Sequence, residues 1–132
     1  MEHTFVMIKP DGLARGLVGE VVGRLERKGL RLEKMRLLTI TEELARRHYA
    51  EHVDKGFFPE LLAFITSGPV VAMEWSGPGA IAVVRGLMGA TDPQKAEPGT
   101  IRGDFGLEVT KNIVHGSDGP TSAARELALF FD

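Results

Sequence analysis

At 132 residues the chain has the length of one domain with a buried core, and we expect a single domain over residues 1–132. A formal net charge of -2 gives no general basic field, so the composition does not favour nucleic-acid binding. The absence of cysteine excludes disulfides and thiolate chemistry. The N-terminus has the pattern of neither a signal peptide nor a membrane span, so we expect a cytoplasmic protein without a membrane partner.

The first third of the chain alternates between strand and helix patterns. Residues 5–8 form a continuous apolar run that predicts a central strand. Apolar residues then recur at helical spacing over residues 13–25, and Gly29 is placed to end that helix. Residues 30–40 alternate with one phase slip, which indicates a strand with a bulge or a strand covered on both sides.

The middle of the chain predicts two helices, a strand and a further helix. Thr41 begins a helix that we expect to reach about residue 53, and Pro59 suits the first turn of a short one. Residues 70–75 predict the third strand, and a helix follows with apolar positions between residues 81 and 88.

Residues 89–108 show no periodicity, and a loop of that length in a small domain tends to be functional. A fourth strand is expected at residues 111–115, and a last helix begins at residues 119–121. This order of elements predicts an α/β ferredoxin-like sandwich, a four-stranded antiparallel sheet with helices packed on one face.

Two short motifs suggest functions that we do not favour. Residues 48–52 fit H-x-x-E-H, a zinc-peptidase pattern, but a peptidase needs a further carboxylate ligand and a substrate cleft, usually in a larger chain. Residues 77–82 fit G-x-G-x-x-A between a strand and a helix, yet Pro78 removes one amide and the acidic partner would have to be Glu97 in the long loop. A tight turn is the better interpretation.

Residues 112–118, with the sequence N-I-V-H-G-S-D, hold the strongest catalytic candidate. Strand alternation would place Ile113, His115 and Ser117 on one face. Gly116 leaves room beside the imidazole for a bulky anion, and an imidazole pKa of roughly 6.5 leaves the nucleophilic free base abundant near neutrality. Taken alone, the segment also fits a polar strand end with an incidental histidine. No G-x-S-x-G elbow supports a hydrolase triad.

Cationic and aromatic residues elsewhere fit a polyphosphate site. Arg85 and Arg102 each present planar paired donors that suit phosphate oxygens, and Lys9 sits where the first strand ends. Phe57, in an expected loop, offers a stacking surface for a base. Each of these residues alone also fits a solvated cation or a core aromatic.

Six blocks of sequence, in order between residue 4 and about residue 130, resemble the signature blocks of the nucleoside diphosphate kinases. They are residues 9–12, 15–20, 67–70, 91–93, 98–105 and 112–118. The last two blocks together are highly specific. The resemblance implies a ping-pong transfer of the γ-phosphate from a nucleoside triphosphate, typically ATP, to a nucleoside diphosphate through a phosphohistidine at His115.

The resemblance also implies how the nucleotide is held. Lys9 and Asn112 would hold the ribose hydroxyls, and Phe57 would stack on the base. Because every base has a π-face, such a site accepts purines and pyrimidines alike. The phosphates would be held by Arg85, Thr91 and Arg102.

The remaining implied parts are a supporting shell, a metal ion and an assembly. Tyr49 would lie close to the catalytic histidine, while Ser117 and Glu126 would buttress it. Mg²⁺ would bridge phosphate oxygens, with Asp118 nearby through water. A homo-oligomer is implied, a hexamer preferred over a tetramer, with no specific nucleic-acid partner. The competing class is a ferredoxin-like module that binds nucleotides, or single-stranded nucleic acid, without turnover.

Overall fold

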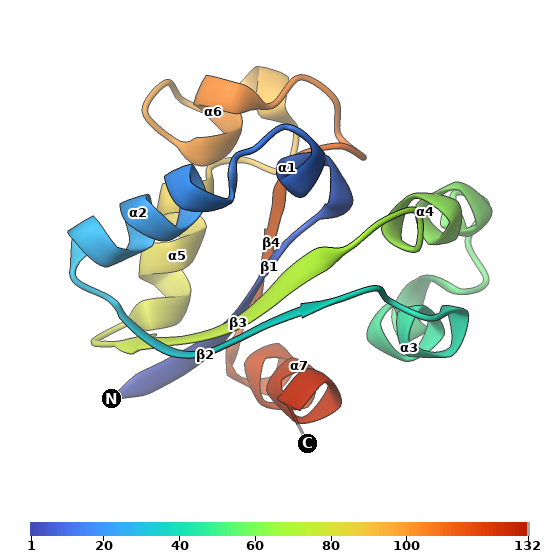
Figure 1. Ribbon diagram of the computed structural model, residues 1–132, viewed down its shortest axis with the longest axis horizontal. Helices are drawn as coiled ribbons and strands as arrows, with labels where there is room; N and C mark the ends of the chain where they lie inside the picture. Colours follow the sequence, from blue (N-terminus) through green and yellow to red (C-terminus); the bar gives the residue numbers. More distant parts are fainter. Residues whose placement is uncertain (132) are drawn as a thin grey trace.

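A computed structural model describes residues 1–131 and contains one four-stranded sheet in the order β2-β3-β1-β4 (Figure 1). All three strand pairs are antiparallel, with Val6 of β1 opposite both Met73 of β3 and Gly116 of β4. This topology confirms the expected ferredoxin-like α/β sandwich. The elements are β1 Glu2–Ile8, α1 Pro10–Ala14, α2 Val18–Lys28, β2 Arg31–Leu38, α3 Glu42–His48, η1 Ala50–His52, α4 Phe58–Ile65, β3 Val70–Gly77, α5 Ala80–Met88, η2 Pro93–Lys95, α6 Ile101–Phe105, β4 Val114–Gly116 and α7 Pro120–Phe131.

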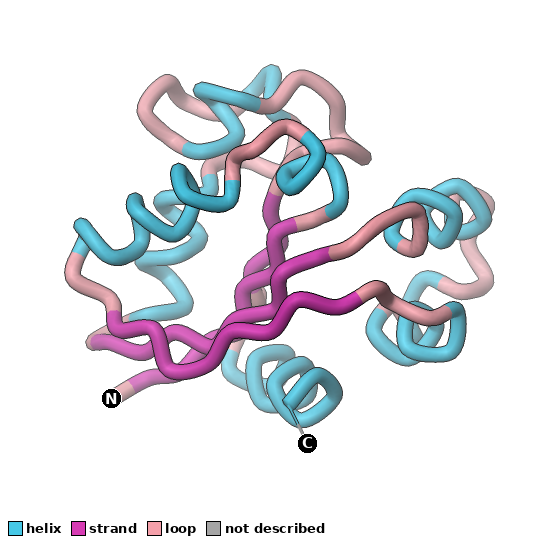
Figure 2. Tube along the Cα trace, viewed as in Figure 1, coloured by secondary structure: helices cyan, strands magenta, loops and turns pink. Residues whose placement is uncertain are grey.

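Helices cover both faces of the sheet, which corrects the expectation that they pack on one face. Helices α2 and α5 lie on one side of the strands, and α3, α4 and α7 lie on the other (Figure 2). Strand β1 separates the two cores, because Val6 and Ile8 belong to the first and Phe5 and Met7 to the second. A continuous apolar run is the pattern of a strand that is buried on both faces.

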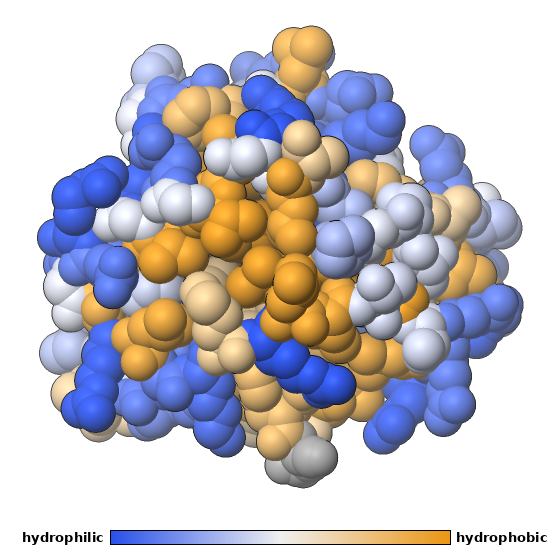
Figure 3. Space-filling view, in the orientation of Figure 1, coloured by the Kyte–Doolittle hydropathy of each residue, from blue (hydrophilic) through white to orange (hydrophobic). Residues whose placement is uncertain are grey.

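Strand β2 forms one edge of the sheet and contains the bulge that its phase slip predicts. Its pairing with β3 shifts between Leu32 and Lys34. The alternative, a strand covered on both sides, is wrong, since Met35 and Leu37 are 48% and 67% exposed. Apolar side chains gather in the middle of the face shown in Figure 3, the side on which β2 lies in front.

Local signals explain where several helices begin and end. The Thr41 hydroxyl accepts a hydrogen bond from Leu44 N–H at 3.1 Å and caps α3. Gly29, at φ 111°, ends α2 as expected. The apolar stripe over residues 13–25 is divided between α1 and α2 at Gly16, which has φ 70°. None of the described helices combines the length and apolar character that crossing a bilayer requires.

Three segments near the catalytic candidate His115 differ from the prediction. Helix α3 ends at His48 rather than near residue 53, and the one-turn helix η1 follows. The aperiodic stretch 89–108 contains η2 and α6, the second capped by Thr100, whose hydroxyl accepts from Gly103 N–H at 3.0 Å. Strand β4 begins only at Val114, because the residue before it leaves the extended conformation.

Candidate active site

A polar cavity of about 340 Å³ opens where α3, α7, β4 and the stretch 89–112 meet. It gathers most of the residues that the sequence singled out from distant parts of the chain. The lining residues are Lys9, His48, Tyr49, Glu51, His52, Arg85, Met88, Thr91, Arg102, Asn112, His115, Gly116, Asp118, Ser122, Arg125 and Glu126.

The backbone just before His115 forms a tight turn at Ile113. Its φ of 78° makes Ile113 the one non-glycine residue with positive φ in the described chain, and Val114 N–H donates to Asn112 O at 2.9 Å across it. A β-branched residue in this conformation is strained by about 1–3 kcal/mol and persists only where its surroundings fix it. Here Ile113 N–H donates to Asp11 Oδ2 at 3.0 Å, and Lys9 N–H donates to Ile113 O at 2.8 Å.

This turn corrects the strand alternation expected for residues 112–118. Ile113 and Val114 are both fully buried in the core beneath α2 and α5, although alternation puts them on opposite faces. His115 and Ser117 nevertheless share a side, because both contact the same carboxylate on α7.

The imidazole of His115 is oriented by Glu126. His115 Nε2 lies 3.1 Å from Glu126 Oε2, and the Ser117 hydroxyl donates to Glu126 Oε1 at 2.6 Å. Burial raises the pKa of Glu126, but the hydrogen bonds and positive charge of these neighbours outweigh it and lower the pKa below its usual value. An ionised carboxylate only accepts hydrogen bonds, so the neutral ring carries its proton on Nε2 and its lone pair on Nδ1. Ser117 bonds to Glu126 and not to the imidazole, which does not fit a hydrolase triad.

Lys9 and Asn112 form a buried pair on the wall opposite α7. Lys9 Nζ donates to Asn112 Oδ1 at 2.7 Å, and Asn112 Nδ2 donates to Thr91 O at 2.9 Å. Burial, followed by the positive charge of Arg102, lowers the pKa of Lys9 to about 8. The charge of Asp11 offsets only part of this shift, and a bound anion would compensate the ammonium group further.

Arg102 is held by three backbone carbonyl oxygens. Its Nη2 donates to Val114 O at 2.7 Å, its Nη1 to Gly89 O at 3.0 Å and its Nε to Asn112 O at 3.4 Å. Burial and then the charge of Arg85 lower its pKa to about 10. Within residues 1–131, neither arginine nor Lys9 lies within 4.0 Å of a carboxylate oxygen. The cavity therefore holds three cationic side chains that form no direct ion pair, an environment that suits a polyphosphate.

Not every predicted site residue lines the cavity. Phe57 lies outside the lining and is 52% exposed, with its ring centroid 5.5 Å from that of His52. Ser117 lies behind the wall as a buried support for Glu126. Asp118 is on the rim, where its carboxylate accepts a hydrogen bond from Ser122.

The lining residues that the sequence does not assign to the site include His48 and Arg125. The His48 ring packs edge-on against Phe5 and His115, with centroids 6.1 and 5.0 Å away. Burial and then the charge of His115 lower the pKa of His48 to about 3, so its ring stays neutral. Arg125 Nη2 lies 3.8 Å from Glu126 Oε2. The H-x-x-E-H motif did mark His48, but it pointed to partners within the motif rather than to β4 and α7.

Comparison with known proteins gives one consistent result. The family model described as nucleoside diphosphate kinase matches residues 2–132. A nucleoside diphosphate kinase of Archaeoglobus fulgidus is 64% identical over 131 residues, covering 99% of this chain and 87% of that protein. One from Thermus thermophilus is 61% identical over 131 residues, 99% of this chain and 96% of that protein.

Solved structures agree with the sequence relatives. A halophilic nucleoside diphosphate kinase from Halobacterium salinarum, in complex with CDP, superposes with a TM-score of 0.97 at 58% identity, covering 99% of this chain and 88% of that one. The nucleoside diphosphate kinase of Encephalitozoon cuniculi superposes with a TM-score of 0.97 at 42% identity over 99% of this chain and 89% of its own.

Proposed function

The chain belongs to the nucleoside diphosphate kinase family, and we propose that it moves a γ-phosphoryl group between nucleotides through Nδ1 of His115. One observation carries this assignment. Glu126 engages Nε2 of His115 at 3.1 Å, which leaves the lone pair of Nδ1 free in a cavity with three cations that form no direct ion pair with a carboxylate. The CDP bound in the Halobacterium salinarum relative supports a nucleotide ligand.

The reaction runs in two half-steps. Nδ1 of His115 attacks the γ-phosphorus of a nucleoside triphosphate, an N–P bond forms, and the bond to the bridging oxygen breaks to release the nucleoside diphosphate. Glu126 stabilises the positive charge that the ring gains, because its carboxylate faces the Nε2–H. A second nucleoside diphosphate then attacks the phosphohistidine through its terminal oxygen and restores the free imidazole.

Positioning and charge provide most of the catalysis, since the transition state resembles metaphosphate and leaves the protein little covalent work. Arg85, Thr91 and Arg102 hold the phosphates. The phenol of Tyr49 sits on the wall beside the histidine, and burial, with Glu126 next, raises its pKa, so it keeps its proton and remains a donor.

Lys9 and Asn112 hold the ribose hydroxyls, and the mutual hydrogen bond that they form at 2.7 Å presents both groups from one wall. Phe57 stacks on the base from outside the cavity, where its half-exposed ring is accessible. A stacking contact does not read base edges, so we expect broad specificity across purines and pyrimidines.

Members of this family use a divalent cation, and we infer that Mg²⁺ is the physiological one. The cavity fits this hard, oxygen-preferring ion, because Mg²⁺ binds through substrate phosphates with one or two carboxylates and Asp118 lies on the rim. When bound, Mg²⁺ neutralises charge on the phosphate oxygens. Asp118 would help to hold the ion through a water molecule.

The protein assembles as a homo-oligomer, with a hexamer preferred over a tetramer. The exposed edge strand β2, with Met35 and Leu37 uncovered, supports contacts between copies. Mass measurement in solution tests this assignment. A cytoplasmic location remains a prediction from the sequence.

Incubation with γ-labelled ATP and Mg²⁺ tests the catalytic proposal. We expect a label on the chain that is acid-labile and alkali-stable, as for phosphohistidine, and that passes to added nucleoside diphosphates of any base. His115→Ala removes the label and the exchange while ATP binding largely survives, and His3→Ala, on the distal end of β1, serves as the matched control. Normal turnover in His115→Ala, or a wild-type protein that binds ATP without becoming labelled, would overturn the assignment in favour of a binding module.

A further inference from the structure

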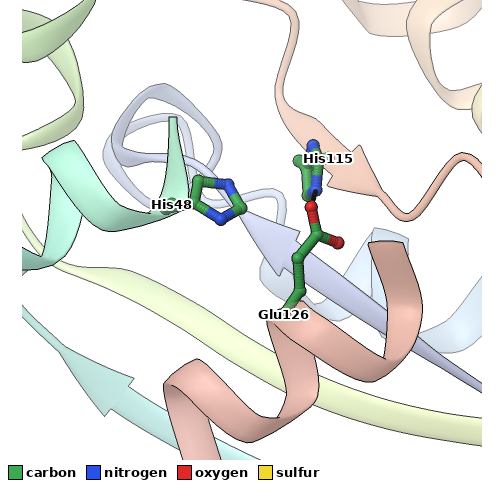
Figure 4. Close-up of side chains that lie close together, drawn as sticks. All are labelled: His48, His115 and Glu126. Atoms are coloured by element: carbon green, nitrogen blue, oxygen red, sulfur yellow. Dashed lines mark hydrogen bonds and ion pairs between the residues drawn. The ribbon is translucent and has the colours of Figure 1, made fainter. Parts of the chain in front are cut away.

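His48, His115 and Glu126 come from α3, β4 and α7 and lie close together (Figure 4), and all three line the cavity. Each offers one metal-binding atom, and the three atoms lie within 4.8 Å of one another. In the described part of the chain, this is the one group of three such residues that are close enough to share an ion. The convergence is independent of H-x-x-E-H, since it joins His48 to distant residues and not to its motif neighbours.

His48 is the second and independent observation. Its side chain is 4% exposed, and neither ring nitrogen has a hydrogen-bond partner among residues 1–131. Buried polar atoms are nearly always paired, so an imidazole with both nitrogens unpaired calls for an explanation such as an ion. A neutral imidazole has a free lone pair, and this is the form that binds metals.

We propose that, in the absence of nucleotide, a first-row transition metal such as Zn²⁺ binds His48, His115 and Glu126. Two imidazole nitrogens and one carboxylate oxygen, with water in the fourth position, form an open tetrahedral zinc site. Bonds near 2.1 Å place the ligand atoms about 3.4 Å apart, close to the 3.1 Å already separating His115 Nε2 and Glu126 Oε2. Since the three atoms already lie within 4.8 Å of one another, closing to this distance requires a shift of at most about 1.4 Å.

The proposed site differs from that of the nucleotide-bound cation. Mg²⁺ prefers oxygen ligands and does not compete for imidazole nitrogen, whereas Zn²⁺ does. Arg125, 3.8 Å from Glu126, and the nearby Lys9 oppose the metal charge. Binding is therefore weaker than at thiolate-rich structural zinc sites.

Metal binding at His115 prevents its Nδ1 atom from acting as the nucleophile. To coordinate at Nε2 of His115, the ring gives up the Nε2 proton and takes one proton on Nδ1 through water, and the lone pair freed at Nε2 goes to the metal. Nδ1 then has no lone pair for the γ-phosphorus. This inhibitory consequence rests on the proposed function, but the binding itself does not.

Titration with Co²⁺ tests the binding directly, on protein from which a chelator has removed bound metal and which contains no nucleotide. A four-coordinate site gives Co²⁺ an intense visible absorption that the aqueous ion lacks, and Zn²⁺ should abolish it stoichiometrically while millimolar Mg²⁺ leaves it unchanged. His48→Gln should weaken Zn²⁺ binding at least about tenfold. His52→Gln, altered on the same wall outside the three ligands, is the matched control and should bind Zn²⁺ like wild type.

Glu126→Gln is the second ligand variant, because glutamine keeps the shape of the side chain but lacks its charge. Circular dichroism measures whether each variant is folded. The proposal is overturned if the wild type gives no Co²⁺ band, if His48→Gln and Glu126→Gln bind as wild type does, or if His52→Gln weakens binding equally. Labelling by γ-labelled ATP with Mg²⁺ is measured on the same preparation. A Co²⁺ band without labelling would reject the proposed phosphotransfer but support the metal site. Labelling without a Co²⁺ band would support the phosphotransfer but reject the metal site.

Discussion

The buried, neutral His48 should make the protein sensitive to mild acid. In the unfolded chain its pKa returns to about 6.5, whereas in the folded protein it is about 3, so between these values the unfolded state binds more protons. Stability is therefore complete above about pH 7 and is lost as pH falls. At pH 5 the unfolded imidazole gains about 1.5 pH units of protonation free energy, which at about 1.4 kcal/mol per unit amounts to about 2 kcal/mol.

Urea unfolding at pH 7.5 and pH 5.0 measures this difference. The protein concentration is held fixed, because unfolding of an oligomer depends on it. We expect wild type to lose about 2 kcal/mol more than His48→Gln between the two pH values. His3→Gln, which removes an imidazole that is 43% exposed and lies outside the site, is the control variant. Equal losses in wild type and His48→Gln would refute a neutral buried ring at position 48.

Three further predictions concern the backbone and charges of the site. Between pH 7 and pH 9 the affinity of the protein for a nucleoside diphosphate, measured by calorimetry, should fall about tenfold, because Lys9, with a pKa of about 8, loses its proton and its charge. An unchanged affinity would contradict the proposed contact of Lys9 with the nucleotide. Asp11→Ala should lower the free energy of unfolding by about 1–3 kcal/mol and should also lower kcat, because the Ile113 N–H loses its acceptor. Asp11→Asn should restore both, and equal defects in the two variants would implicate the charge instead. Gly103→Ala should destabilise the protein by about 1–3 kcal/mol in thermal unfolding, since the new Cβ would lie 2.0 Å from the Glu97 carbonyl oxygen. An unchanged stability would show that the backbone at Glu97 can move to accommodate the methyl group.

Periodicity and capping predicted most elements of the sheet and its helices. The strand around β1, the bulge in β2, the Thr41 cap and the Gly29 helix end all follow from local chemistry that acts within a few residues. The packing of helices on both faces was missed, although the unbroken apolar run of β1 contained the signal.

The site was predictable as a set of residues but not as a geometry. Family-like motifs marked His115, Lys9 and Arg102, and the fold gathers them around one cavity. The left-handed turn at Ile113 depends on Asp11, about a hundred residues away, and no local preference of isoleucine favours it. The position of His48 depends likewise on three separate elements meeting, which spacing along one helix does not reveal.

Arg102 joins the architecture of the cavity to its chemistry. The guanidinium that we propose to hold phosphate also donates hydrogen bonds to the carbonyl oxygens of Gly89, Asn112 and Val114. A mutational scan that ranks residues by lost turnover would therefore overstate its direct contact with substrate, because part of the loss would be collapse of the wall. Lysine at this position would keep a cation yet leave most of those carbonyls without a donor, so the conservative exchange should be nearly as damaging as truncation.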